Sequence, residues 1–158
     1  SIFFFYGCIK ENKIILKHNF EQSQSGWNEI NVIKGEAHSG KYFTFTDSLH
    51  PFSSAFTKNL SEITSQKIKR IDIVTWIRHK ESSASANFIV SLDNSTAPVF
   101  WRSISTIEAA PEINEWVRLF ASYDVPDSIG KNETLRVYLW NINKLPVDAD
   151  DFEIRLFY

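Results

Sequence analysis

The chain has 158 residues, with 17 Lys and Arg against 19 Asp and Glu and a formal net charge of −2. This length suits one folded domain, because a single core usually serves about 100–200 residues. The basic residues form no block that could serve as an electrostatic footprint for nucleic acid. The only cysteine is Cys8, which excludes an internal disulfide. The 13 Phe, 5 Trp and 5 Tyr favour strands and surfaces that stack against flat ligands.

The first eight residues form an apolar run that ends at the charged residue Lys10. The run is too short to cross a bilayer, which needs about 20 apolar residues. It is the tail of a bacterial lipoprotein signal with Cys8 as the lipidated residue, the end of a membrane helix, or an ordinary first strand. The first two interpretations place the domain outside the cytoplasmic membrane, at the cell surface or in the periplasm. We therefore expect a signal or anchor remnant, or an N-terminal extension, over 1–12 and a single domain over 13–158.

Short runs with alternating apolar and polar residues continue from residue 13 to the end of the chain. Polar turns, several with Pro or Gly, separate them. A period of two predicts an all-β fold, an antiparallel β-sandwich (jelly roll) of about ten strands. The expected strands are Lys13–Asn19, Glu29–Lys34, Lys41–Thr46, Ser54–Asn59, Ile68–Arg78, Ala86–Leu92, Pro98–Ser105, Glu115–Tyr123, Thr134–Asn141 and Asp151–Tyr158.

The same alternation gives several strands one aliphatic face, because successive side chains point to opposite sides. The expected core comprises Ile71, Ile73, Val117, Leu119, Val137, Leu139, Ile154 and Leu156. Three of these strands place Trp or Tyr, with Arg two residues away, on the opposite face. Sugar C–H groups stack on such rings, and arginine binds hydroxyls. If the strands share one sheet, a ligand-binding surface is expected from Trp76, Arg78, Trp116, Arg118, Tyr138 and Trp140.

Sequence motifs for catalysis are missing. There is no G-x-S-x-G, no H-E-x-x-H and no phosphate-binding glycine loop. The four histidines stand at no metal-ligand spacing. Asp150 and Asp151 are adjacent, whereas glycoside cleavage needs two facing carboxyl groups about 5–9 Å apart. We therefore expect a binding domain and no enzyme.

Three segments occur in a characteristic order. Asn19-Phe-Glu21 is followed by Trp27, then by Ser39-Gly-Lys-Tyr42, and Asp150-Asp-Phe-Glu-Ile154 lies near the end. Over about residues 13–158 this order resembles the jelly-roll carbohydrate-binding modules of bacterial glycan-degrading enzymes. The strand at 137–141 is similar to members from Bacteroidetes-type surface proteins and from soluble tails of membrane glycosyltransferases.

The resemblance implies a non-catalytic glycan-binding module within a larger cell-surface or secreted protein. The alternative is a structural protein–protein interaction domain, which would use the aromatic face to dock onto an envelope assembly or serve as a glycosyltransferase tail. The two differ in geometry, because a glycan site is a groove with exposed rings and polar groups. A docking face is flatter and its apolar surface is continuous.

The resemblance also implies a structural calcium site. Its ligands would be the Glu21 carboxylate, backbone oxygens around Gly40 and Lys41, and Asp151, with Asp150 as a further candidate. Calcium takes six to eight hard oxygen ligands, including carbonyl groups, so this ligand set is chemically suitable. The alternative is that Asp150 and Asp151 form a turn and accept hydrogen bonds from backbone amides.

Overall fold

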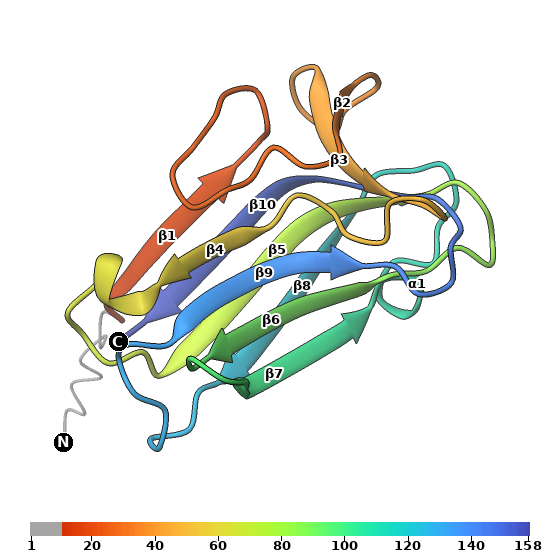
Figure 1. The fold of residues 1–158 in the computed structure, drawn as a ribbon. Coiled ribbons are helices and arrows are strands. Elements are labelled where there is room, and N and C mark those ends of the chain that lie inside the picture. The colour runs from red at the N-terminus through yellow and green to blue at the C-terminus, as the bar shows by residue number, and fades with distance from the viewer. Residues whose placement is uncertain (1–10) are drawn as a thin grey trace, which may run out of the picture.

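The computed structural model describes residues 11–158, which form two antiparallel sheets packed face to face (Figure 1). The predicted all-β sandwich is confirmed. The strands are β1 (Lys13–His18), β2 (Val32–Lys34), β3 (Tyr42–Thr46), β4 (Phe56–Asn59), β5 (Arg70–His79), β6 (Asn87–Asp93), β7 (Pro98–Ser105), β8 (Val117–Asp124), β9 (Thr134–Trp140) and β10 (Val147–Phe157). The only helical turns among the described residues are η1 (Leu60–Glu62) and α1 (Thr106–Ala109).

No helix in the part of the chain that the structure describes is long and apolar enough to cross a membrane. The three interpretations of the first eight residues, and with them the predicted lipidation of Cys8, lie outside the described residues.

The larger sheet has six strands. Five follow the order β2-β3-β10-β5-β8, and β1 also pairs with β10. One edge of β10 pairs with β5 along most of its length. The other edge pairs first with β3, through Val147–Ala149, and then with β1, through Phe152–Phe157. The smaller sheet has four strands in the order β4-β9-β6-β7. Strands from the beginning, middle and end of the chain therefore meet at β10.

The core lies between the two sheets and contains most of the predicted residues. Seven are at most 1% exposed, namely Ile71, Ile73, Leu119, Val137, Leu139, Ile154 and Leu156. The eighth prediction, full burial of Val117, is wrong, because this residue is only half-buried. Val117 begins β8, which is an edge strand of the larger sheet, so it has a neighbouring strand on one side only.

A β-bulge interrupts β10. Against β5, Asp150 pairs with Trp76 but Glu153 pairs with Val74, so the last strand carries one extra residue. The bulge reverses which residues point inward: Val147 and Ala149 are buried before it, and Phe152, Ile154 and Leu156 after it. The sequence alternation breaks here, which is why Asp151 was the predicted start of a strand that in fact begins at Val147. The Thr75 hydroxyl donates to the Asp150 carbonyl at 2.9 Å.

Replacing Phe152, which follows the bulge, should strongly destabilise the sandwich. Its ring is 1% exposed and packs against Phe20, Trp27 and Phe88 with centroid separations of 5.5, 5.3 and 5.6 Å. Phe152→Ala should lower the free energy of unfolding in denaturant by about 3–5 kcal/mol, because it removes packing and leaves a cavity. The control is Phe120→Ala, whose ring is 44% exposed. Equal losses in the two variants would contradict this packing.

Candidate functional site

The six predicted ligand-binding residues do not share one surface. Trp76 and Arg78 lie on β5, Trp116 immediately precedes β8, and Arg118 lies on β8, all on the outer face of the six-stranded sheet. Tyr138 and Trp140 lie on β9 in the four-stranded sheet, on the opposite side of the sandwich. The expectation of one surface is therefore wrong for these last two. Alternation identifies the outer face of each strand, but it does not say which strands are neighbours.

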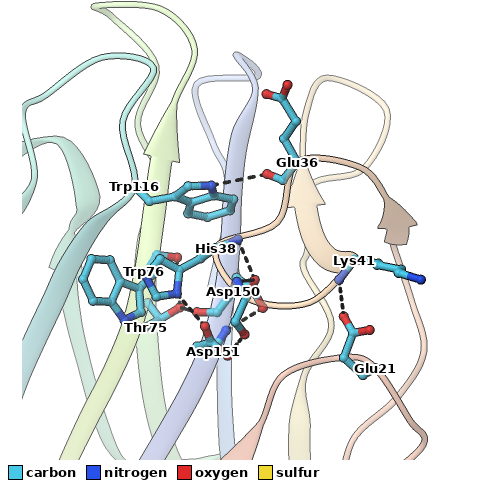
Figure 2. Close-up of polar contacts among 10 residues, drawn as sticks. Glu21, Glu36, His38, Lys41, Thr75, Trp76, Trp116, Asp150 and Asp151 are labelled. Atoms are coloured by element: carbon cyan, nitrogen blue, oxygen red, sulfur yellow. Dashed lines mark hydrogen bonds and ion pairs between the residues drawn. The ribbon is translucent and has the colours of Figure 1, made fainter.

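The aromatic rings on the six-stranded sheet are partly covered by the loop between β2 and β3 (Figure 2). The His38 ring stacks on Trp76, with centroids 3.8 Å apart and planes at 14°. The Trp116 indole nitrogen donates to the Glu36 carbonyl at 3.3 Å. Much of the aromatic surface predicted for this face is therefore used by the protein itself.

Arg78 is also engaged within the protein. Its guanidinium donates to Asp148 at 2.8 Å and lies 4.5 Å from the Trp116 ring centroid. Only 12% of the Arg78 side chain is exposed. Arg118, in contrast, is exposed. Of the two predicted arginines, only Arg118 has a guanidinium that is open to a ligand.

Carboxylates from distant segments hold the β2–β3 loop in place. Asp150 accepts hydrogen bonds from the backbone N–H groups of His38 and Ser39 at 2.9 and 3.1 Å. Asp151 accepts from the Ser39 hydroxyl at 2.6 Å and contacts the His38 ring nitrogen at 2.6 Å. The extra residue in β10 therefore places two successive carboxylates against one loop.

Glu21 holds the other end of the same loop. One of its oxygens accepts from the backbone N–H groups of Lys41 and Tyr42 at 2.7 and 2.8 Å. Gly40 has φ +63°, and a Cβ atom there would lie 2.4 Å from the Glu21 carboxylate. Glycine is therefore required by both the backbone conformation and the close approach of Glu21.

The predicted calcium ligands are thus gathered around one loop, but their oxygens already accept hydrogen bonds. The Lys41 carbonyl accepts from the Gly35 N–H at 2.9 Å, and Glu21, Asp150 and Asp151 accept from the donors described above. Among residues 11–158, no three Asp, Glu, His or Cys side chains form a metal-binding group. In this structure the three carboxylates fasten the loop through these hydrogen bonds.

Asp150 is the most perturbed acid at this loop. It is fully buried, and burial raises the pKa of its carboxyl to about 7. The Ser39 N–H lowers this pKa, the charge of Asp151 raises it, and the N–H groups of Asp151 and His38 lower it. A cation bound beside the carboxylate would lower this pKa, because it favours the charged form.

The outer face of the four-stranded sheet presents aromatic rings to solvent. Phe52, Trp101 and Trp140 are 48%, 42% and 37% exposed. The rings of Phe52 and Trp140 are nearly parallel, with planes at 16° and centroids 6.5 Å apart. Sequence reasoning did not find Phe52, which lies just before β4, and left Trp101 unassigned. The burial of Phe100 between exposed Val99 and Trp101 shows that alternation along β7 places Trp101 outside.

One apolar residue on the outer face of this sheet is buried. Ile89 points outward on β6, where it pairs with Ser103 and Tyr138, yet its side chain has no exposed surface. The larger side chains around it must therefore cover it. Burial raises the pKa of Tyr138, and the negative charge of Asp93 raises this pKa further. Ile89 is therefore an apolar residue that is buried outside the core between the two sheets.

A groove of about 370 Å³ runs beside Phe52. We call it the Phe52 groove; its lining includes Asn28, Phe52, Thr57, Arg136 and Tyr138. Arg136 forms an ion pair with Asp93, with Nε and Oδ2 3.1 Å apart, while half of its side chain stays exposed. The Phe52 groove therefore combines flat rings with groups that can bind hydroxyls.

No protein-family model and no curated protein sequence matches this chain. Solved structures do match. The xylan-binding domain CBM22-1 of Paenibacillus barcinonensis Xyn10C has a TM-score of 0.58 and 20% identity, covering 93% of this chain and 97% of that one. The CBM22-2 domain of the same protein has a TM-score of 0.61 and 14% identity, covering 88% and 97%.

A further match is the family 22 carbohydrate-binding module from the C-terminal part of Clostridium thermocellum Xyn10B, studied for the role of its cleft in ligand binding. Its TM-score is 0.54 with 14% identity, covering 90% of this chain and 91% of that one. At such low identity the similarity concerns the fold. The chain has the jelly-roll fold of carbohydrate-binding modules, as the resemblance of its three short segments predicted.

A second groove, beside Trp76, is lined in part by His18. This histidine should make the fold sensitive to acid. Its Nδ1 lies 3.0 Å from the side-chain amide oxygen of Gln24, and its buried Nε2 has no hydrogen-bond partner among the described residues. Burial lowers the pKa of His18 below the usual 6.5. The unfolded chain therefore binds more protons, and this contribution to stability is lost as pH falls below about 6.5. Between neutral and acidic pH, the free energy of unfolding in denaturant should fall less for His18→Phe than for the unaltered domain. An equal fall in the two proteins would contradict the assignment.

Proposed function

We propose that this domain is a non-catalytic glycan-binding module whose binding face is the outer surface of the four-stranded sheet. The observation that carries the proposal is the pair of exposed, nearly parallel rings of Phe52 and Trp140 beside a groove that contains Arg136. Sugar rings present C–H patches that stack on aromatic faces, and their hydroxyls accept or donate hydrogen bonds. A groove with rings on one side and polar groups on the other suits both kinds of contact.

The charges on this face favour a neutral ligand. Arg136 is already paired with Asp93, so the groove offers donors and acceptors without a large net charge. The outward residues between the rings include Ser103, which is half-buried and interrupts the apolar surface. A protein-docking face would need a more continuous apolar patch. The interrupted surface and the groove therefore support glycan binding over the docking alternative.

The structural neighbours suggest which glycan to test first. Two of them are named as xylan-binding domains, and a CBM22-1–GH10 fragment of a Clostridium thermocellum endo-1,4-β-xylanase was solved with xylohexaose. This chain covers 28% of that last protein, with a TM-score of 0.54 and 13% identity. We propose xylan-type β-glycans as the first candidates. A module for such polymers would act outside the cytoplasm, as part of a larger secreted or cell-surface protein.

Replacing the exposed rings should weaken glycan binding and leave the fold intact. Trp140→Ala and Phe52→Ala each remove one stacking surface, which is worth about 0.5–1.5 kcal/mol beyond area burial, or roughly a twofold to tenfold loss of affinity. Affinity for xylohexaose is measured by isothermal titration calorimetry, after a glycan array has identified other ligands. The matched control is Phe120→Ala, an exposed ring on the other sheet.

The same variants separate the glycan proposal from protein docking. If the unaltered domain retains no glycan on the array or on insoluble polysaccharide, the proposed function is wrong. If Trp140→Ala and Phe52→Ala bind glycan as tightly as the unaltered domain, the assignment of the binding face is wrong. Release of a bound protein partner by these variants, with glycan binding unchanged, would favour the docking alternative.

We also propose that calcium binds at the β2–β3 loop. What supports this proposal is the convergence of Glu21, Gly40 and Asp151 on that loop, from segments far apart in the sequence. Calcium would add its own charge among these carboxylates and tie the start of the chain to its end. Binding would require His38 and Ser39 to give up the oxygens of Asp151 that they now contact.

Calcium should raise the thermal stability of the domain. A ligand that binds only the folded state adds about 2.7 kcal/mol at a concentration one hundred times its dissociation constant. A chelator should therefore lower the melting temperature of the unaltered domain. Glu21→Gln and Asp151→Asn should remove the difference between melts with and without chelator. Glu36→Gln is the control, because the Glu36 side chain on the same loop is 97% exposed. Identical melts of the unaltered domain in calcium and in chelator would contradict the proposal.

A further inference from the structure

We propose a second binding site, for a sugar that carries a carboxylate, in the groove beside Trp76 on the six-stranded sheet. This Trp76 groove has a volume of about 390 Å³. It lies on the opposite side of the sandwich from the Phe52 groove, and its lining shares no residue with that groove. The site therefore stands or falls independently of the function proposed for the four-stranded sheet.

The Trp76 ring is held in a fixed orientation at the edge of this groove. His38 stacks against it at 3.8 Å, and in the calcium-free domain both oxygens of Asp151 hold His38 and Ser39 in turn. The ring is half-buried, and the part that His38 leaves open lines the groove. A ring fixed before binding loses little conformational entropy when a sugar stacks on it.

One cation in the Trp76 groove has no ionic partner among residues 11–158. The two acids that line it have partners, since Asp151 contacts His38 and Glu153 contacts Arg155 at 2.6 Å. Lys17 lies 3.8 Å from Glu153. Arg118 forms no ion pair within residues 11–158, and its side chain is exposed. An arginine with a free planar guanidinium suits a carboxylate, which it can bind through two parallel hydrogen bonds.

Neutral polar groups complete the site. The amide side chains of Asn19 and Gln24 line the same groove and can bind hydroxyl groups. A uronic acid presents the matching chemistry: a sugar ring for Trp76, a carboxylate for Arg118, and hydroxyls for the amides. An acidic peptide would supply the carboxylate but would have no ring face and few hydroxyls for these other groups.

The test compares one acidic oligosaccharide with its neutral counterpart. Trigalacturonate and its methyl ester have the same sugar rings, but only the first carries carboxylates. Titration calorimetry with the full chain should show binding of trigalacturonate and much weaker binding of the ester. Arg118→Gln should lower the affinity by about tenfold or more, because a hydrogen bond between charged groups contributes about 1.5–3 kcal/mol. Arg118→Lys should restore part of the affinity.

Two control variants establish that trigalacturonate binds in the Trp76 groove and not elsewhere on the domain. Arg102→Gln removes an exposed arginine from the other sheet and should leave trigalacturonate binding unchanged. Trp140→Ala should weaken xylohexaose binding only. Equal binding of trigalacturonate and its ester, no effect of Arg118→Gln, or loss of trigalacturonate binding in Trp140→Ala would each overturn the proposal. Equally tight binding of a glutamate peptide would also overturn it, because the site would then recognise charge alone.

Discussion

The sandwich depends on the pairing of β10 with three other strands. β5 occupies one edge of β10, and β3 and β1 share the other edge on either side of the bulge. Val147 and Phe152 are five residues apart, so in a regular strand their side chains would point to opposite faces. The extra residue in β10 lets both point into the same core. It also leaves Asp150 and Asp151 at the point along β10 where the pairing with β3 stops and the pairing with β1 starts. A regular strand would have placed alternate residues there, and the two adjacent carboxylates would not both reach the β2–β3 loop.

This loop makes the two faces of the sandwich different. On the six-stranded sheet, the fastened loop brings His38 and Glu36 onto Trp76 and Trp116, so one ring is stacked and the other is hydrogen-bonded. The described loops leave the rings of Trp101 and Trp140 on the four-stranded sheet open to solvent. Both sheets carry aromatic residues on their outer faces. The exposure of the aromatic rings therefore distinguishes the candidate glycan-binding face from the covered face. The sequence pattern is similar on both faces and does not distinguish them.

Much of the fold could be predicted from the sequence, because alternation is a local property of each strand. All ten strands occur near their expected positions, and Ile71, Leu139 and Ile154 are buried as expected. The start of β10 was missed because a bulge breaks the same alternation that marks a strand. The candidate site was harder to predict. Whether Trp76 and Trp140 face the same side depends on which sheet each strand joins, and that is decided by pairings between residues far apart in the chain.

Residues on the outer face of the four-stranded sheet have two physical roles, which are stabilising the fold and contacting a ligand. The side chains around Ile89 exclude water from an apolar residue that points away from the core, so Tyr138 contributes to stability as well as to the candidate binding face. Trp140 and Phe52 lie further along the sheet and keep more of their surface exposed. Removing an exposed ring costs little folding energy, whereas uncovering Ile89 exposes apolar surface that the folded state now buries. Loss of binding after a change at Trp140 or Phe52 would therefore report on ligand contact, while the same loss after a change at Tyr138 would mix contact with stability.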